Sequence, residues 1–320
     1  MSRFFRSIVL SALFAAVLAQ DGATNSTSAE PEAGSNIPIA GFLPKNAPAI
    51  VALTLYAISA SVLWINFFVI APRRRFMLTL TIGMTTMAAG FALRIEYISS
   101  PFSVGAYIAT DLFILLSPCF FLATDYMLLS HLAASFDEGL HKRCLLIRHS
   151  LIVKIFVWSD VSTFLLQSSG GGLTSTNETS LVNLGNNLTM IGLILQAVSF
   201  LLFTVVLLIF GLRVCKGFPD VWYPKSPHPF KIVSRKPIDD WRILFYVLCV
   251  TSVCILCRSI FRITEFAGGY TGYVAMHEGF FYAFDALPLW LGMSIFCFVW
   301  PVRALPTHSN DLGLNNDISL

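Results

Sequence analysis

Seven long apolar segments constrain this chain more than any other feature of its sequence. A helix needs about 20 mostly apolar residues to cross the hydrocarbon core of a bilayer, and each segment is at least that long. Backbone polar groups cannot remain unpaired in lipid, so such segments must be helical. We therefore predict an all-α polytopic membrane protein with seven transmembrane helices. They lie at about residues 48–71, 76–98, 104–134, 148–169, 188–212, 243–266 and 275–300.

Composition supports this class and excludes others. Hydrophobic residues make up 56% of the chain and charged residues 12%, and the mean hydropathy is +0.72, which is far too apolar for a soluble domain. The net charge of +3 is small, and the basic residues lie in short loops, so we expect no nucleic acid partner. Gly170-Gly171-Gly172 lacks the lysine and the preceding strand of a phosphate loop. We expect it to end the fourth helix, and we expect no cofactor.

The charges of the connecting loops predict the orientation of the chain. Basic residues gather in the first, third and fifth loops, whereas the second, fourth and sixth hold almost none. By the positive-inside rule, the N-terminus lies outside and the C-terminus in the cytosol. The fifth loop, residues 213–242, is the longest cytosolic connection. It is either a solvated loop or a surface for anionic lipid headgroups, and we name no protein partner for it.

The ends of the chain indicate traffic through the secretory pathway. Residues 1–19 carry Arg3 and Arg6, an apolar run, and small residues before a cleavage site, which is typical of a signal peptide; a signal anchor is the alternative. Residues 20–47 predict an extracellular disordered tail, residues 48–303 the transmembrane domain, and residues 304–320 a short cytosolic tail. We expect the plasma membrane, with the vacuolar or endoplasmic reticulum membrane as the alternative. The predicted glycosylation sites, on the outer side, are Asn25, Asn177 and Asn187.

Charged residues inside the spans are the strongest functional signal. Arg258, Arg262 and Glu265 fall at i, i+4 and i+7, and so share one helix face, as do Glu278 and Asp285. Acids outnumber arginines within the spans, so some carboxylates should lack a partner and either hold a proton or attract a cation. We predict one polar chamber near the outer leaflet; the alternative is ion pairs that only fix packing. The candidate substrate-binding or coupling residues are Asp160, Gln167, Arg258, Arg262, Glu265, His277, Glu278 and Asp285.

Metal chemistry and hydrolysis are poorly supported. Cys254 and Cys257 form a C-x-x-C on an apolar helix, but no second cysteine or histidine pair accompanies them, so packing is their expected role. A zinc-dependent intramembrane hydrolase would need several converging ligands. His131 and His277 fall at opposite ends of the predicted topology. We therefore expect no metal site and no enzyme activity.

Between Arg258 and Pro288, the pattern R-S-I-F-R-x-x-E-F is followed by G-Y and by H-E-x-x-F-Y-x-F-D-A-L-P. This stretch resembles the fungal RTA-like family of lipid-translocating exporters, named for resistance to 7-aminocholesterol. Further likeness lies in Leu116-Ser117-Pro118, Ser159-Asp160 and the segment from Gln167 to Gly172. The resemblance implies seven spans, export of sphingoid long-chain bases, drug and sterol-analogue resistance, and in some members porphyrin traffic.

Two functions remain open at this stage. The first is a transporter or floppase that offers Asp160, Glu278 and Asp285 to the ammonium head of a lipid, with Glu278 or Asp285 able to couple transport to protons. The second is a seven-helix receptor or sensor that regulates lipid asymmetry without transporting. The expected partners are membrane lipids, namely sphingoid bases and, as further candidates, sterol analogues or porphyrins.

Overall fold

The computed structural model describes residues 46–70, 74–99, 104–134, 136, 149–174, 178–217, 241–268 and 277–304. These residues are almost entirely helical and contain no strand. The predicted signal peptide, most of the extracellular tail, Asn25, Asn177, most of the 213–242 loop and the C-terminal tail lie outside the described residues, so those predictions stand untested. The long helices are α2 (Asn46–Val69), α3 (Met77–Ser99), α4 (Val104–Ala134), α6 (His149–Thr174), α7 (Thr179–Gly217) and α9 (Trp241–Ala267).

The seventh span is assembled from three consecutive pieces rather than one continuous α-helix. They are α11 (Glu278–Phe281), the π-helical turn η1 (Tyr282–Ala286) and α12 (Leu287–Phe298), and a short helix α13 (Pro301–Ala304) follows. A π-turn inserts an extra residue into the helical repeat. Pro288 is the second residue after it and has no N–H to donate to the preceding turn. The hydroxyl of Tyr56 on α2 donates to the carbonyl of Ala286, the last residue of the π-turn, at 2.7 Å.

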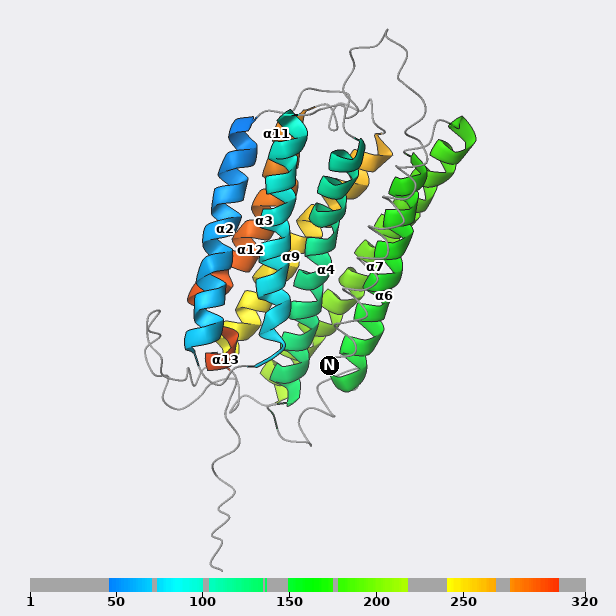
Figure 1. Cartoon of the computed structure of the whole chain (residues 1–320). Helices are drawn as coiled ribbons and strands as arrows, with labels where there is room; N and C mark the ends of the chain where they lie inside the picture. The colour runs from blue at the N-terminus through cyan, green and yellow to red at the C-terminus, as the bar shows by residue number, and fades with distance from the viewer. Residues whose placement is uncertain are drawn as a thin grey trace, which may run out of the picture.

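Within the described residues, seven helices are long and apolar enough to cross a membrane, which confirms the predicted fold class. They run side by side in one bundle (Figure 1). Large apolar side chains point outward, for example Ile58 with 64% and Val253 with 66% of the side chain exposed. Such a surface suits lipid rather than water. The inside–outside orientation of the termini stays a prediction, so the two ends of the bundle are called here the α11 end and the α13 end.

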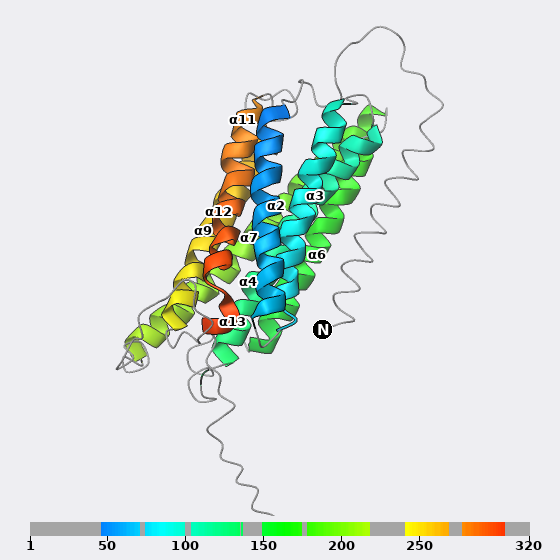
Figure 2. The same ribbon diagram turned by 60° about the vertical axis from the view of Figure 1, so that its left-hand side comes forward.

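The helices form a closed ring in chain order. One member of the ring, α4, projects into its interior. Neighbours pack in the sequence α2, α3, α4, α6, α7, α9 and α12, and α12 returns to α2. Figure 2 shows α2 lying between α12 on one side and α3 on the other. α4 also contacts α9 across the ring. In its most apolar stretch 72% of residues are buried, against 33–44% for the other spans. Most polar side chains on α4 therefore lie inside the protein, whereas Asp111, near the start of the helix, is exposed.

The prediction that Gly170-Gly171-Gly172 ends the fourth helix is wrong, because α6 continues to Thr174. Gly170 instead lets α6 and α7 approach closely. A Cβ at Gly170 would lie 2.7 Å from the carbonyl oxygen of Gly185 and would also collide with Thr189, while a Cβ at Gly185 would lie 2.6 Å from the carbonyl oxygen of Gly170. Small residues commonly form such contacts between transmembrane helices. Asn187, a predicted glycosylation site, lies exposed within α7, two residues after Gly185.

Candidate functional site

An ion-pair cluster joins α9 to the seventh span near the α11 end. Asp285 on the π-turn is fully buried and lies between two arginines of α9. Its Oδ2 accepts from Nη2 of Arg262 at 2.9 Å, and its Oδ1 lies 2.6 Å from Nε of Arg258 without hydrogen-bond geometry. Glu265 lies 3.2 Å from the same Arg262. The predicted shared face of Arg258, Arg262 and Glu265 thus lies against Asp285.

A second ion pair extends this cluster to α3. Arg94 donates to Glu278 at 2.9 Å. The ring of Phe281 lies between two cations, with its centroid 4.8 Å from the Arg94 guanidinium carbon and 5.4 Å from that of Arg262. Cation–π contacts of this kind hold guanidinium groups in partly apolar surroundings. Glu278 and Asp285, predicted to share a face, therefore pair with different helices. Both of their charges are balanced.

Asp160 on α6 presents the opposite situation. It is 2% exposed, and neither carboxylate oxygen has a hydrogen-bond partner. The hydroxyl of Tyr126 on α4 lies beside it and interacts with its carboxyl group, although the geometry falls short of a hydrogen bond. Tyr126 is held by edge-on packing against Phe203, with ring centroids 4.6 Å apart. A buried carboxylate with no counter-charge either holds a proton or attracts a cation. Among the candidate residues, Asp160 is the acid able to accept a new partner.

A chain of neutral polar groups lies on the α11 side of Asp160. Gln167, two turns along α6, donates to Gln196 of α7 at 3.0 Å. The amide of Gln196 in turn lies 3.9 Å from the Cys119 sulfur on α4. Gly192 makes room for this contact, because a Cβ there would lie 2.7 Å from Cγ of Gln167. The three helices around Asp160 are therefore joined by amides and close packing, with no positive charge among these groups.

Asp125 is a second buried acid, closer to the α13 end of α4. It is fully buried; its Oδ2 accepts from the hydroxyl of Thr251 on α9 at 2.9 Å, while its Oδ1 has no partner. Among the described residues, neither Asp125 nor Asp160 is paired with an arginine, as expected from the excess of acids over arginines within the spans. Neither lies in the ion-pair cluster, so the structure distributes the polar residues over several levels rather than one chamber near one leaflet.

The remaining candidates are less central. His277 is exposed and precedes α11, where its ring packs against Phe280 with centroids 6.1 Å apart. His131 lies in the last turn of α4, where its ring stacks on that of Phe76. Across the part of the chain that the structure describes, no three His, Cys, Asp or Glu side chains are placed to hold one metal ion. Sequence reasoning missed Tyr126 and Cys119 as neighbours of Asp160, because such residues on an apolar helix are usually core.

Comparison with known proteins gives a family and several relatives. The family described as "RTA1 like protein" matches residues 80–308, which include every span except α2. In Saccharomyces cerevisiae, protein RTA1 is 31% identical over 69% of this chain and 64% of its own length. Protoporphyrin uptake protein 1 is 33% identical over 65% of this chain and 63% of its own length. The chain thus spans slightly less than two thirds of either relative.

A more distant relative carries the most specific name. The sphingoid long-chain base transporter RSB1 of Saccharomyces cerevisiae is 24% identical over 62% of this chain and 56% of its own length. No solved structure matches the chain. These comparisons support a membrane lipid or resistance role for the family without selecting one substrate.

Proposed function

The chain belongs to the RTA1-like family of membrane proteins, and from this premise we propose that it moves amphiphilic lipids across the plasma membrane. The proposed substrates are sphingoid long-chain bases or sterol-like toxic compounds, whose removal confers stress or drug resistance. Two relatives, named as a sphingoid long-chain base transporter and a protoporphyrin uptake protein, support this class of substrate. No cofactor is part of the proposal.

The observation that carries the proposal is the unpartnered carboxyl group of Asp160 inside the bundle. A sphingoid base has an ammonium head and a hydrocarbon tail. Moving the head through the bilayer exposes a charge to hydrocarbon, which costs at least about 2.5–3.5 kcal/mol at the centre. Asp160 would offset that cost by supplying a counter-charge midway across. The hydroxyl of Tyr126 lies beside it and would offer a further acceptor.

Glu278 and Asp285 fit this role less well than Asp160. Each already neutralises arginine side chains, so an ammonium group would have to displace a guanidinium that is itself buried. Removing one partner of a buried pair leaves the other uncompensated and costs about 3–5 kcal/mol. We therefore assign the head-group role to Asp160 and a structural role to Asp285. Transport is downhill or coupled to protons.

The test is translocation of a fluorescent sphingoid base in vesicles that contain only the purified full-length protein, with and without a pH gradient. We expect the wild-type protein to move the base faster than a fluorescent phospholipid. Asp160→Asn keeps the size of the side chain and removes its charge, so it should lower the rate by about ten-fold or more. Asp125→Asn is the matched control, a second buried acid whose Oδ2 accepts from Thr251 of α9, and should retain most of the rate.

Two results would contradict the proposal. Folded wild-type protein that moves no base under either condition would favour the receptor or sensor function instead. Equal rates for Asp160→Asn and the wild type would remove Asp160 from the mechanism while leaving transport in place.

A further inference from the structure

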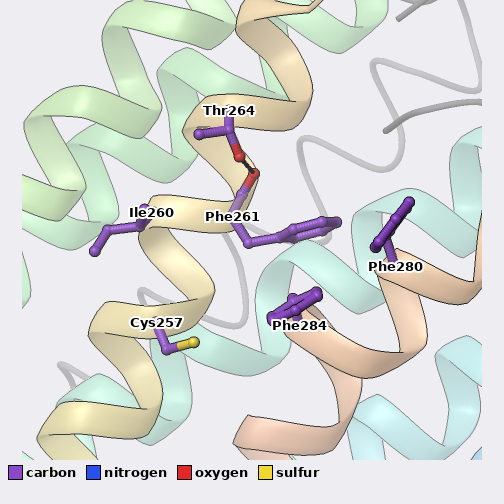
Figure 3. Close-up of a pocket in the computed structure, with 6 residues that line it drawn as sticks. All are labelled: Cys257, Ile260, Phe261, Thr264, Phe280 and Phe284. Carbon is purple, nitrogen blue, oxygen red and sulfur yellow. Dashed lines mark hydrogen bonds between the residues drawn. The ribbon is translucent and has the colours of Figure 1, made fainter. Parts of the chain in front are cut away.

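An apolar groove opens between α9 and the seventh span, near the α11 end, and is called here the lateral groove. Its volume is about 410 Å³, within the range of roughly 300–1,000 Å³ that small-molecule sites have. Figure 3 shows the ring of Phe261 on α9 facing those of Phe280 and Phe284 on the opposite helix. The lining residues are Cys257, Ile260, Phe261, Thr264, Phe280 and Phe284.

The chemistry of the lateral groove suits hydrocarbon. The hydroxyl of Thr264 donates to the carbonyl of Phe261 at 2.7 Å, so it is satisfied within α9. The near-parallel rings of Phe261 and Phe284 have centroids 6.0 Å apart. Ile260 is 63% exposed and Phe284 45%, on the outer surface of a membrane-spanning bundle. The medium that reaches this groove is therefore the lipid bilayer, and an alkyl chain is what can fill it.

The lateral groove and the ion-pair cluster lie back to back on the same helices. Cys257 directly precedes Arg258, Phe261 precedes Arg262, and Thr264 precedes Glu265; on the π-turn, Phe284 precedes Asp285. The aromatic wall thus separates lipid from buried charge by the thickness of one helix face.

Glu265 is the member of the cluster that can exchange its partner. Its side chain is 18% exposed, whereas that of Asp285 is fully buried. Glu265 shares Arg262 with Asp285, so an ammonium group that takes up Glu265 leaves Arg262 in contact with Asp285, which Arg258 also contacts. Glu265 directly follows Thr264, which lines the groove, and a carboxylate beside an apolar groove complements a lipid with a basic head. This is the charge complementarity that selects an amine over a neutral or acidic amphiphile.

We propose that the lateral groove binds the alkyl chain of a single-chain lipid amine, with its ammonium head against Glu265. The inference rests on the proposed function and adds to it the place where the substrate leaves the bilayer and meets the protein. From there, the head group would have to pass the ion-pair cluster to reach Asp160.

Photolabelling tests the site on the wild-type protein. The probe is a long-chain primary amine with a diazirine in mid-chain, added to purified full-length protein in phosphatidylcholine vesicles. Labelled residues are identified by mass spectrometry. We expect saturable labelling of Phe261, Phe280 or Phe284, displaced by excess sphingoid base. The alcohol with the same chain should displace the probe about ten-fold less well, because it lacks the charge that Glu265 recognises.

A matched pair of variants on α9 tests whether the groove is used in transport. Ile260→Trp fills the groove, whereas Val253→Trp places the same ring seven residues earlier on that helix face, at a side chain of similar exposure, 66% against 63%. Ile260→Trp should lower labelling and base translocation by about five-fold or more, and Val253→Trp by less than about two-fold.

The outcomes separate this inference from the proposed function. The wild type could move the base while the label maps to other residues, or while amine and alcohol displace it equally. Either result would contradict binding in the lateral groove and would leave the proposed transport function unaffected. Saturable, amine-selective labelling in a protein that moves no base would support the groove and contradict transport. Binding in the lateral groove would also be contradicted if Ile260→Trp were labelled, and moved the base, to the same extent as the wild-type protein.

Discussion

The two sides of the bundle differ in how their buried polar side chains are paired. Where α3, α9 and the seventh span meet, each buried acid faces an arginine, and the pairs run from Arg94–Glu278 to Asp285 between Arg258 and Arg262. Where α4, α6 and α7 meet, the helices are joined by glycine contacts and amides. There Asp160 has no hydrogen-bond partner.

This difference separates structure from function. A buried ion pair removed at one partner is strongly destabilising, so it fixes the positions of its helices. A buried acid with no partner contributes no such bond and is itself costly when charged. A protein that keeps one in its interior gains something other than stability, and in this molecule we propose that it is a place for an ammonium head.

The largest effect on stability is expected from Asp285→Asn. The substitution leaves Arg258 and Arg262 buried without a full counter-charge, which should cost about 3–5 kcal/mol. Thermal unfolding of the purified protein in detergent measures the loss. Glu265→Gln is the matched control: it removes a carboxylate from the same cluster but leaves Arg262 paired to Asp285, and should cost about 1 kcal/mol or less. Equal melting of Asp285→Asn and wild type would show that the cluster does not hold α9 to the seventh span.

The glycine contact on the other side should give an intermediate effect. Gly170→Ala forces a Cβ against the backbone of α7 and should cost about 1–3 kcal/mol. Gly171→Ala, one residue along, meets open space and should be neutral or stabilise α6 by up to about 1 kcal/mol. The same unfolding measurement compares the two. A loss of equal size at both positions would mean that helix propensity, and not the approach of α6 to α7, explains the effect.

Glu278→Gln should have the smallest effect on stability. Arg94 is 16% exposed on its side chain and retains the faces of Phe281 and Tyr282, at 4.8 and 5.7 Å. The expected cost is about 1 kcal/mol, with transport of a sphingoid base largely retained. A cost as large as that of Asp285→Asn would show that the two ion pairs form one structural unit. If Glu278→Gln were stable but no longer transported the base, Glu278 would have to be counted among the residues that contact the substrate.

Much of the fold could be predicted from sequence, because hydrophobic length alone requires the spans. The helix bounds differ most at α7, which begins at Thr179 rather than near residue 188. Its first turns are polar, so no apolar segment marks them; the contact of Gly185 with Gly170 packs them against α6. The same contact explains why three glycines do not end α6. Such contacts depend on which helices are neighbours, and periodicity does not contain that information.

The site could be predicted only as a set of charged residues. The spacing of Arg258, Arg262 and Glu265 correctly gave a shared face. The partner of each acid could not be obtained in this way, because Arg94 and Glu278 are 184 positions apart in the chain. The π-turn, which places Asp285 toward α9, also has no sequence signal apart from the nearby Pro288. Three-dimensional packing was therefore needed to distinguish Asp160 from the paired acids.

The most direct measurement is the shift in melting temperature that a sphingoid base produces in the purified protein. A ligand that binds only the folded state raises the melting temperature as its concentration exceeds the dissociation constant. We predict a concentration-dependent rise for the wild type, for Asp125→Asn and for Glu278→Gln, and a clearly smaller rise for Asp160→Asn, in which the lateral groove alone binds the base. An undiminished rise in Asp160→Asn would contradict the claim that the unpartnered acid binds the head group.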